Sequence, residues 1–283
     1  MKIAIVTDTN SGISEKEAKK LGVYCLPMPF SVDGEWMLEG VDLTAEEFYR
    51  RQAAGANITS SQPSPETVTN LWDKLLAEYE AVVHIPMSSG LSGTTATALA
   101  LAAEYDGRVQ VVDNKRISLP QRQSVLDAQV LAKRGLTAAQ IKQNLEENAL
   151  KASVYLTVDT LKYLKKGGRI TPAAAAIGTV LNIKPLLQIQ GGGIDAFGKV
   201  RGLAQAQDKL MDAICADLTG RFAGMPMHIG VAYSGAPEVG KKWQKYVQER
   251  FPRCKVQCSA LGLSIACHTG PGALGVGCYY YEE

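Results

Sequence analysis

The chain has 283 residues, of which 46% are hydrophobic and 20% are charged, and its formal net charge is +2 at pH 7. This composition is typical of a soluble globular protein with one large domain or two ordinary ones. A charge so close to neutral argues against a nucleic-acid-binding protein. No apolar run approaches the roughly 20 residues that span a bilayer, so we expect no membrane span.

The N-terminal segment MKIAIVTDTNSG becomes polar after six residues, too early for the apolar core of a signal peptide. The six cysteines include no Cys-x-x-Cys pair, so we expect no metal site. Reduced thiols in a cytoplasmic protein are the simplest account of these cysteines.

The first 150 residues alternate between strand-like and helical patterns. Apolar runs at 2–7, 23–29, 82–87 and 109–113 are typical of buried strands, and a helix is expected around 124–134. A hairpin is expected within 30–41 and a hydroxyl-rich loop at 58–65. This order predicts an N-terminal three-layer α/β/α domain, residues 1–150, with a mainly parallel sheet. Asp8 follows the first strand and either bonds the neighbouring loops or faces a ligand.

From residue 151 onward, several strands accompany each helix. Strands are expected near 153–158, 183–187, 198–201, 228–233, 255–259 and 275–281, with helices near 204–218 and 238–250. A shorter helix should begin after Thr171, and a glycine-rich loop should hold His268 between the last two strands. This pattern predicts a C-terminal α+β domain with a mixed sheet, residues 151–283.

The segment 82–101, VVHIPMSSGLSGTTATALAL, reads as a buried strand that turns directly into a helix. Such a turn leaves backbone N–H groups unpaired at the positive end of the helix dipole. With the hydroxyls of Ser88, Ser89 and Ser92, it is suited to hold a phosphate or a carboxylate. An ordinary turn in which these hydroxyls cap the helix is the alternative interpretation.

Seven segments resemble the DegV family in the same order and spacing along the whole chain. They are IVTDTNSGI at 5–13, SQPSP at 61–65, MSSGLSGT at 87–94, VVDNK at 111–115, LKKGGRI at 164–170, LNIKPLL at 181–187 and HTGPGALGVG at 268–277. The resemblance implies a bacterial fatty-acid-binding protein of two domains, not an enzyme, with no cofactor. It also implies a partner: a separate fatty acid kinase, related to dihydroxyacetone kinases, that converts the bound long-chain fatty acid to an acyl phosphate.

The same resemblance implies which residues bind the carboxylate between the domains. These are Ser60, Ser92, Arg169 and His268, supported by Thr59, Ser89, Gly93 and Thr269, while Arg201 serves phosphate transfer with the kinase. Ser60 stands where family members usually have threonine. His268 is expected to be a donor that can be protonated near neutral pH.

The acyl chain needs an apolar tunnel, and composition suggests two sets of residues for it. One set is the small-residue helix with the alanines at 173–176, Ile177, Val180 and Leu181, and the other is the segment 261–265. Hydrolysis is an alternative function, because Ser92 on a strand–turn–helix and a distant His268 have the chain order of a hydrolase. The sequence around Ser92 is not G-x-S-x-G, however, and no acid stands in place before the histidine.

Overall fold

A computed structural model describes residues 2–176 and 182–283. The N-terminal half is built on a four-stranded parallel sheet in the order β2-β1-β6-β7. Its strands are β1 (Ile3–Asp8), β2 (Tyr24–Leu26), β6 (Ala81–Ile85) and β7 (Val109–Val111). The expected α/β/α domain with a parallel sheet is therefore confirmed.

Helices cover both faces of this sheet because successive side chains of a strand point to opposite faces. Ile5 and Val83 pack against one helical layer, and Val6 and Val82 pack against the other. The first layer is α1 (Glu15–Leu21), α5 (Ser118–Lys133) and α6 (Ala138–Glu147), and the second is α3 (Pro65–Leu76) and α4 (Thr94–Ala102). Two short 3₁₀ turns, η1 (Thr9–Ser11) and η2 (Ala103–Tyr105), follow β1 and α4.

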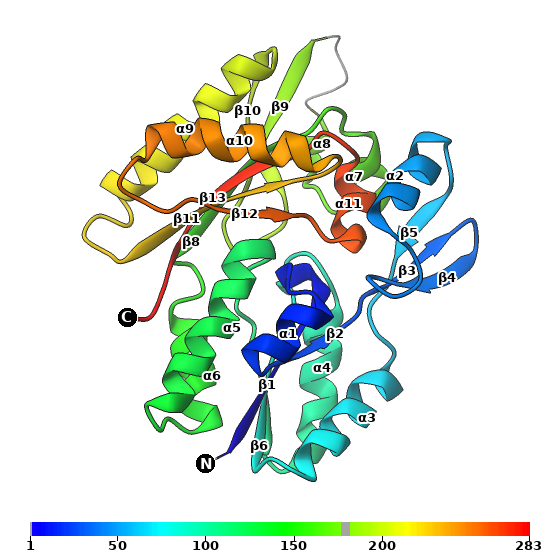
Figure 1. Ribbon diagram of the computed structural model, residues 1–283, viewed down its shortest axis with the longest axis vertical. Coiled ribbons are helices and arrows are strands. Elements are labelled where there is room, and N and C mark those ends of the chain that lie inside the picture. The colour runs from blue at the N-terminus through cyan, green and yellow to red at the C-terminus, as the bar shows by residue number, and fades with distance from the viewer. Residues whose placement is uncertain (1, 177–181) are drawn as a thin grey trace.

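The C-terminal half is built on a six-stranded sheet in the order β10-β9-β8-β13-β11-β12. Among the described residues β11 and β12 pair in parallel and the other neighbouring strands pair antiparallel, so the sheet is mixed, as predicted. The strands are β8 (Ala152–Thr157), β9 (Ile183–Ile189), β10 (Asp195–Arg201), β11 (Met227–Tyr233), β12 (Gln257–Ala260) and β13 (Leu274–Tyr280). One face packs against α9 (Leu203–Thr219) and α10 (Pro237–Arg250), and the other faces α5 of the N-terminal half (Figure 1).

The hairpin expected within 30–41 is confirmed, and a third strand, which was not expected, extends it into an antiparallel sheet. It joins β4 (Glu35–Leu38), β3 (Pro29–Val32) and β5 (Ile58–Ser60), so the predicted loop at 58–65 begins as a strand. With α2 (Ala45–Ala53) it packs on α11 (Leu263–Thr269), where Phe30 and Phe48 meet Ala266. Residues from the first 60 thus share a core with a helix near the C-terminus (Figure 1).

Two more short helices complete the C-terminal half, α7 (Lys162–Gly167) and α8 (Pro172–Ala175). Thr171 caps α8, as predicted, by accepting a hydrogen bond from the Ala174 N–H at 3.2 Å. His268 was predicted in a glycine loop, but it lies in the last turn of α11, which ends at Gly270. Gly270 has a φ of +71°, which glycine adopts without strain and which stops the helix there.

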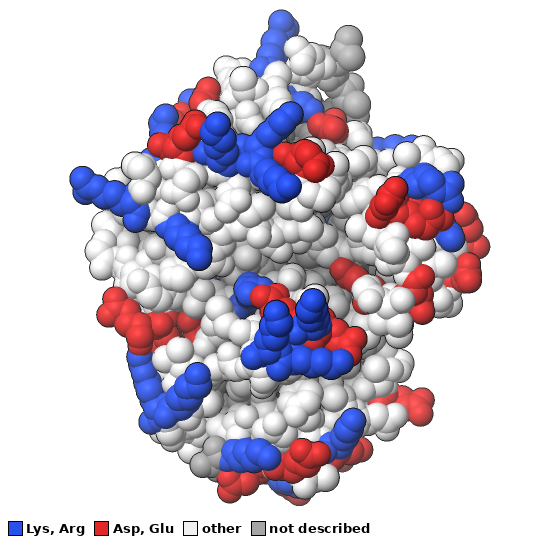
Figure 2. Space-filling model, in the orientation of Figure 1, with Lys and Arg blue, Asp and Glu red and all other residues white. Residues whose placement is uncertain are grey.

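The chain passes from the parallel sheet to the mixed sheet between α6 and β8, and the domain division at residue 150 stays a prediction. Basic and acidic side chains are interspersed over the face that Figure 2 shows, with the lysines of α1 near its centre. No helix within residues 2–176 and 182–283 combines the length and apolar character needed to cross a membrane.

Candidate ligand-binding cavity

A cavity of about 310 Å³ lies between the six-stranded sheet and the N-terminal half. Its lining comes from β8, β9, β11 and β13, the first turn of α5, the loop between β6 and α4, and α11. Pockets for small organic ligands typically measure ~300–1,000 Å³. Most lining side chains are apolar, and the polar ones come from a few loops and helix ends. A ligand with an apolar part and a polar group would therefore match the lining.

The apolar floor of the cavity lies on the six-stranded sheet, where glycines are set among larger apolar residues. Because alternate residues of a strand share a face, Gly275 and Gly277 leave that face of β13 without side chains. Val276 and Cys278, between and after them, belong to the core under α9 and α10. Strand pairing places these glycines in two rows that cross the sheet. One row is Leu156, Gly275 and Ala232, and the other is Val154, Gly277 and Gly230.

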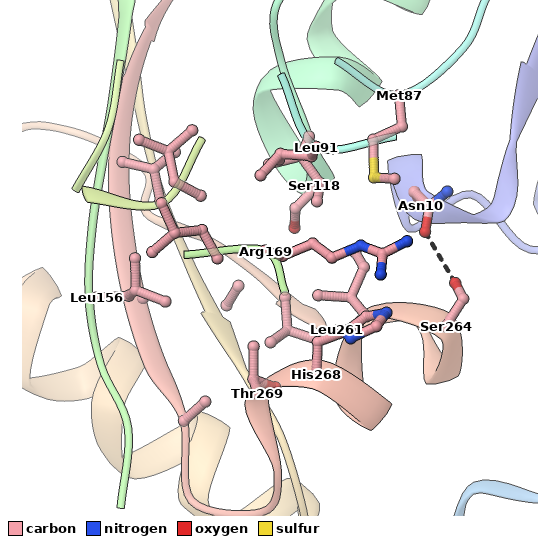
Figure 3. Close-up of a pocket in the computed structure, with 18 of the residues that line it drawn as sticks. Asn10, Met87, Leu91, Ser118, Leu156, Arg169, Leu261, Ser264, His268 and Thr269 are labelled. Carbon is pink, nitrogen blue, oxygen red and sulfur yellow. Dashed lines mark hydrogen bonds between the residues drawn. The ribbon is translucent and has the colours of Figure 1, made fainter. Parts of the chain in front are cut away.

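Ser60 and His268 form the best-defined polar contact at the cavity. Ser60 Oγ, at the end of β5, lies 2.7 Å from His268 Nε2, on the last turn of α11. Arg169 follows α7 and extends across the cavity with its guanidinium close to the imidazole of His268 (Figure 3). Arg169 Nη1 also donates to the carbonyl oxygen of Gly167. Three elements that are far apart in the sequence thus bring these three side chains together.

Gly167 fixes the position of the His268 ring. A Cβ at Gly167 would overlap His268 Nδ1, so the ring fits only against a residue without a side chain. Burial and the nearby charge of Arg169 lower the pKa of His268 to about 4. This lowered pKa contradicts the expectation that His268 can be protonated near neutral pH. The positive charge at this end of the cavity comes from Arg169.

The SSGLSG turn holds Ser92 at the cavity by hydrogen bonds within the turn. Ser92 Oγ lies 2.8 Å from Thr94 Oγ1 and accepts a hydrogen bond from the Thr94 N–H at 3.2 Å. The N–H groups of Leu91 and Ser92 bond the carbonyl of Ser88. Ser92 therefore bonds the first N–H of α4 from the residue before the N-cap, Gly93, and it also lines the cavity.

The remaining predicted residues divide into two groups. Gly93 and Thr269 line the cavity. Ser89 does not, because its hydroxyl donates to Asp113 Oδ2 at 2.7 Å and accepts from Lys115 Nζ at 2.6 Å. Thr59 and Arg201 are exposed and lie outside the lining. A supporting contact to the ligand from Thr59 or Ser89 does not fit this geometry.

Asp8 organises the loops at the strand ends. It is buried and accepts hydrogen bonds from the N–H groups of Asn10 and Met87, at 3.0 and 2.9 Å, and from Gln121 Nε2 at 3.1 Å. Burial raises its pKa to about 6. The two loops that it holds carry Asn10 and Met87 into the cavity lining. Of the two interpretations of Asp8, the structure supports the loop-bonding one.

The predicted tunnel residues lie only partly at the cavity. Leu261, Ser264 and Ile265 line it, but the alanines at 173–176 do not. Ile177, Val180 and Leu181 fall outside the described residues. The floor residues on β11 and β13, and also Asn10 and Ser118, were not predicted from the sequence. The signal for the floor was present in LGVG, where glycine recurs at alternate positions of a strand.

Fold and cavity together define an α/β protein with a parallel sheet, a mixed sheet and a small antiparallel sheet, and with a cavity that joins an apolar floor to polar side chains. The model of the family described as "Uncharacterised protein, DegV family" matches residues 2–281. The chain belongs to the DegV family. It is 35% identical over 280 residues to a DegV domain-containing protein of Deinococcus radiodurans, with 98% of each chain covered. It is 30% identical to the protein DegV of Bacillus subtilis over the full length of both.

Solved structures show the same fold. A fatty-acid-binding DegV family protein from Thermus thermophilus superimposes with a TM-score of 0.89 at 33% identity, over 99% of this chain and 100% of that one. DegV of Bacillus subtilis, described as a fatty acid binding protein, gives 0.87 at 29% identity, over 99% of each. A stearic acid-binding protein from Eubacterium ventriosum gives 0.86 at 26% identity, over 98% of each.

Proposed function

We propose that this protein binds a long-chain fatty acid as cargo, with the carboxylate at Ser60, Ser92, Arg169 and His268 and the acyl chain over the glycine-containing floor. The observation that carries the proposal is that one cavity joins this apolar floor to a cationic, hydroxyl-rich cluster. The fatty-acid-binding relatives from Thermus thermophilus and Bacillus subtilis, alike over nearly the whole chain, support it.

A buried carboxylate requires a counter-charge and hydrogen-bond donors, because it loses its hydration. The guanidinium of Arg169 is planar and can donate two parallel hydrogen bonds to a carboxylate. Neutral His268 adds a donor through Ser60: when Nε2 carries the proton, it donates to Ser60 Oγ, and the serine hydrogen is free for the ligand. Ser60 keeps the hydroxyl of the usual threonine, which is the group this contact needs.

Native mass spectrometry after gentle purification tests the cargo. We expect a species heavier than the polypeptide by one fatty acid, which is released on denaturation and identified by lipid analysis. A protein that carries no lipid and takes up none when palmitate is added would overturn the proposal.

Variants of the cluster test the position of the carboxylate. Ser60→Ala and Arg169→Gln each remove a donor, and loss of a hydrogen bond to a charged group costs about 1.5–3 kcal/mol, or roughly 10- to 150-fold in Kd. Thr59→Ala is the matched control, because Thr59 neighbours Ser60 on β5 but is exposed. Equal affinities for all three variants would place the carboxylate elsewhere.

We propose further that the protein is cytoplasmic and presents the bound carboxylate to a fatty acid kinase related to dihydroxyacetone kinases, which forms the acyl phosphate. Arg201 ends β10 and is exposed, so it is available to a partner and to a phosphate group. Arg201→Ala should leave the lipid content unchanged and abolish acyl-phosphate formation with such a kinase. Full acyl-phosphate formation by this variant would remove Arg201 from the coupling step.

The Ser60–His268 contact is the one feature that favours a hydrolase. A nucleophilic serine needs a histidine base that a third group orients, as in catalytic triads. Here His268 Nδ1 faces Gly167 instead of a carboxylate, and Ser92 bonds Thr94 rather than His268. Labelling of Ser60 or Ser92 by a fluorophosphonate probe would support hydrolysis, and we expect no labelling.

A further inference from the structure

Ser118, the first residue of α5, carries a cavity-lining hydroxyl that the carboxylate cluster does not use. The residue is only 8% exposed, and its hydroxyl has no hydrogen-bond partner among residues 2–176 and 182–283. Figure 3 shows Ser118 beside Leu91, with the hydroxyl pointing into the cavity. A hydroxyl that faces a cavity without a protein partner is available to donate to, or accept from, an oxygen or nitrogen atom of a ligand.

The backbone at Ser118 adds further donors at the same point. The φ of Ser118 is +57°, a left-handed conformation that is uncommon for a residue other than glycine. Ile117 precedes the helix and offers no side-chain cap, and Pro120 has no N–H, so the N–H groups of Ser118 and Leu119 are the first donors at this end of the 16-residue helix. In contrast, the neighbouring helix α6 is closed by a full capping box. The hydroxyl of Ser118 therefore stands at the open, positive end of a long helix.

The surroundings of Ser118 are apolar and differ from those of the carboxylate cluster. Its neighbours in the sequence, Ile117 and Leu119, are buried and also line the cavity. A Cβ built on Gly230 of the floor would meet Leu119 Cδ1 at 2.5 Å, which places this turn of α5 against the floor. In Figure 3 the guanidinium of Arg169 points away from Ser118, towards Asn10 and Ser264. Ser118 thus faces the part of the cavity that would hold the acyl chain.

We propose that the cavity selects fatty acids that carry an oxygen substituent on the chain, a hydroxyl or oxo group, and that Ser118 with the first N–H groups of α5 binds that oxygen. This inference rests on the proposed fatty-acid function and specifies its ligand class. An unsubstituted acyl chain would leave the Ser118 hydroxyl and the N–H groups in contact with methylene groups and without hydrogen bonds. An oxygen substituent at this point of the chain would form hydrogen bonds with them. A site built to hydrogen-bond a ligand group discriminates strongly against the analogue that lacks it.

The experiment compares the Kd of stearate with those of hydroxystearates that carry the hydroxyl at successive carbons, by displacement of a fluorescent fatty acid. We expect one position at which the hydroxy acid binds roughly tenfold or more tightly than stearate. Ser118→Ala should remove this preference. Ser118→Gly should also remove the preference, and glycine adopts a positive φ without strain. The glycine variant therefore provides the test if the alanine variant folds poorly. Ser60→Ala is the contrast, because it should weaken both acids by the same factor and keep the preference.

Two results would overturn the inference while leaving the fatty-acid function standing. One is equal affinity of the wild type for stearate and every hydroxystearate. The other is an equal loss of both ligands in Ser118→Ala and Ser118→Gly, which would assign the hydroxyl to the carboxylate. If the wild type binds neither acid, the fatty-acid function itself fails and the inference falls with it.

Discussion

Filling the floor of the cavity at Gly275 should shorten the acyl chain that the protein accepts. A Cβ at Gly275 would have Leu156 Cβ, Tyr155 O and Ala232 Cβ at 3.8–3.9 Å, which is ordinary van der Waals contact. The Cβ of Gly275→Leu therefore fits without a clash, and the rest of the leucine side chain extends from the floor into space that the ligand would fill. By contrast, the Cβ of a side chain at Gly230 would collide with Leu119 and Tyr279.

The size of the effect follows from the apolar area that the ligand loses. If the leucine displaces about three methylene groups at ~0.8 kcal/mol each, the long acid loses about 2.4 kcal/mol, or roughly 50-fold in Kd. Acids short enough to stop before Gly275 should bind as before. The Kd values of a series of saturated acids from dodecanoate to stearate, measured by displacement of a fluorescent fatty acid, give both the loss for long acids and the chain length at which it begins.

Ala173→Leu is the matched control, since it adds apolar volume to an exposed position of α8 outside the cavity. We expect its affinities to equal those of the wild type for every acid. If Gly275→Leu bound the whole series unchanged, the chain would not run over β13. If Ala173→Leu alone weakened the long acids, the tunnel would lie along the small-residue helix instead.

Three further predictions concern the site and the core. Burial lowers the pKa of His84 from its ordinary 6.5 to about 3. Between about pH 7 and pH 5 the unfolded chain therefore binds a proton at His84 that the folded protein does not bind, and the free energy of unfolding falls by about 2 kcal/mol. His84→Phe should remove this loss of stability. Urea unfolding at a series of pH values measures the free energy of unfolding of both proteins. The raised pKa values of Asp8 and Asp127 increase stability on acidification, but they do so equally in the wild type and the variant. Identical pH profiles of the two proteins would therefore refute the prediction. Gly167→Ala should displace His268 and weaken fatty-acid binding roughly tenfold, with unfolding nearly unchanged; unaltered Kd values would contradict the role of Gly167. Arg116→Met should cost about 2–4 kcal/mol of stability, because buried Arg116 donates to the carbonyls of Asn148 and Ala149; an unchanged denaturation midpoint would argue against this.

Local patterns in the sequence predicted most individual elements and the family. Apolar runs marked the strands, Thr171 marked the start of α8, and the SSGLSG segment marked the turn that brings Ser92 to the cavity. These features could be predicted because residues close together in the chain determine the backbone conformation of a strand or turn and the cap of a helix. The helix expected around 124–134 begins earlier, at Ser118, and Pro120 fits its first turn because the missing proline N–H has no intrahelical partner there.

The cavity itself was decided by tertiary structure. Its floor exists because β13 pairs with β8 and β11, strands distant in the chain, in a register that aligns Gly275 and Gly277 with Ala232 and Gly230. The ligand roles of Ser60, Ser92, Arg169 and His268 stay predictions, but their meeting at one cavity depends on this folding. The protonation of His268 depends on it too, because burial and Arg169 lower its pKa. The sequence by itself determined the elements and the residue types, whereas long-range pairing determined where the empty space lies and which polar groups face it.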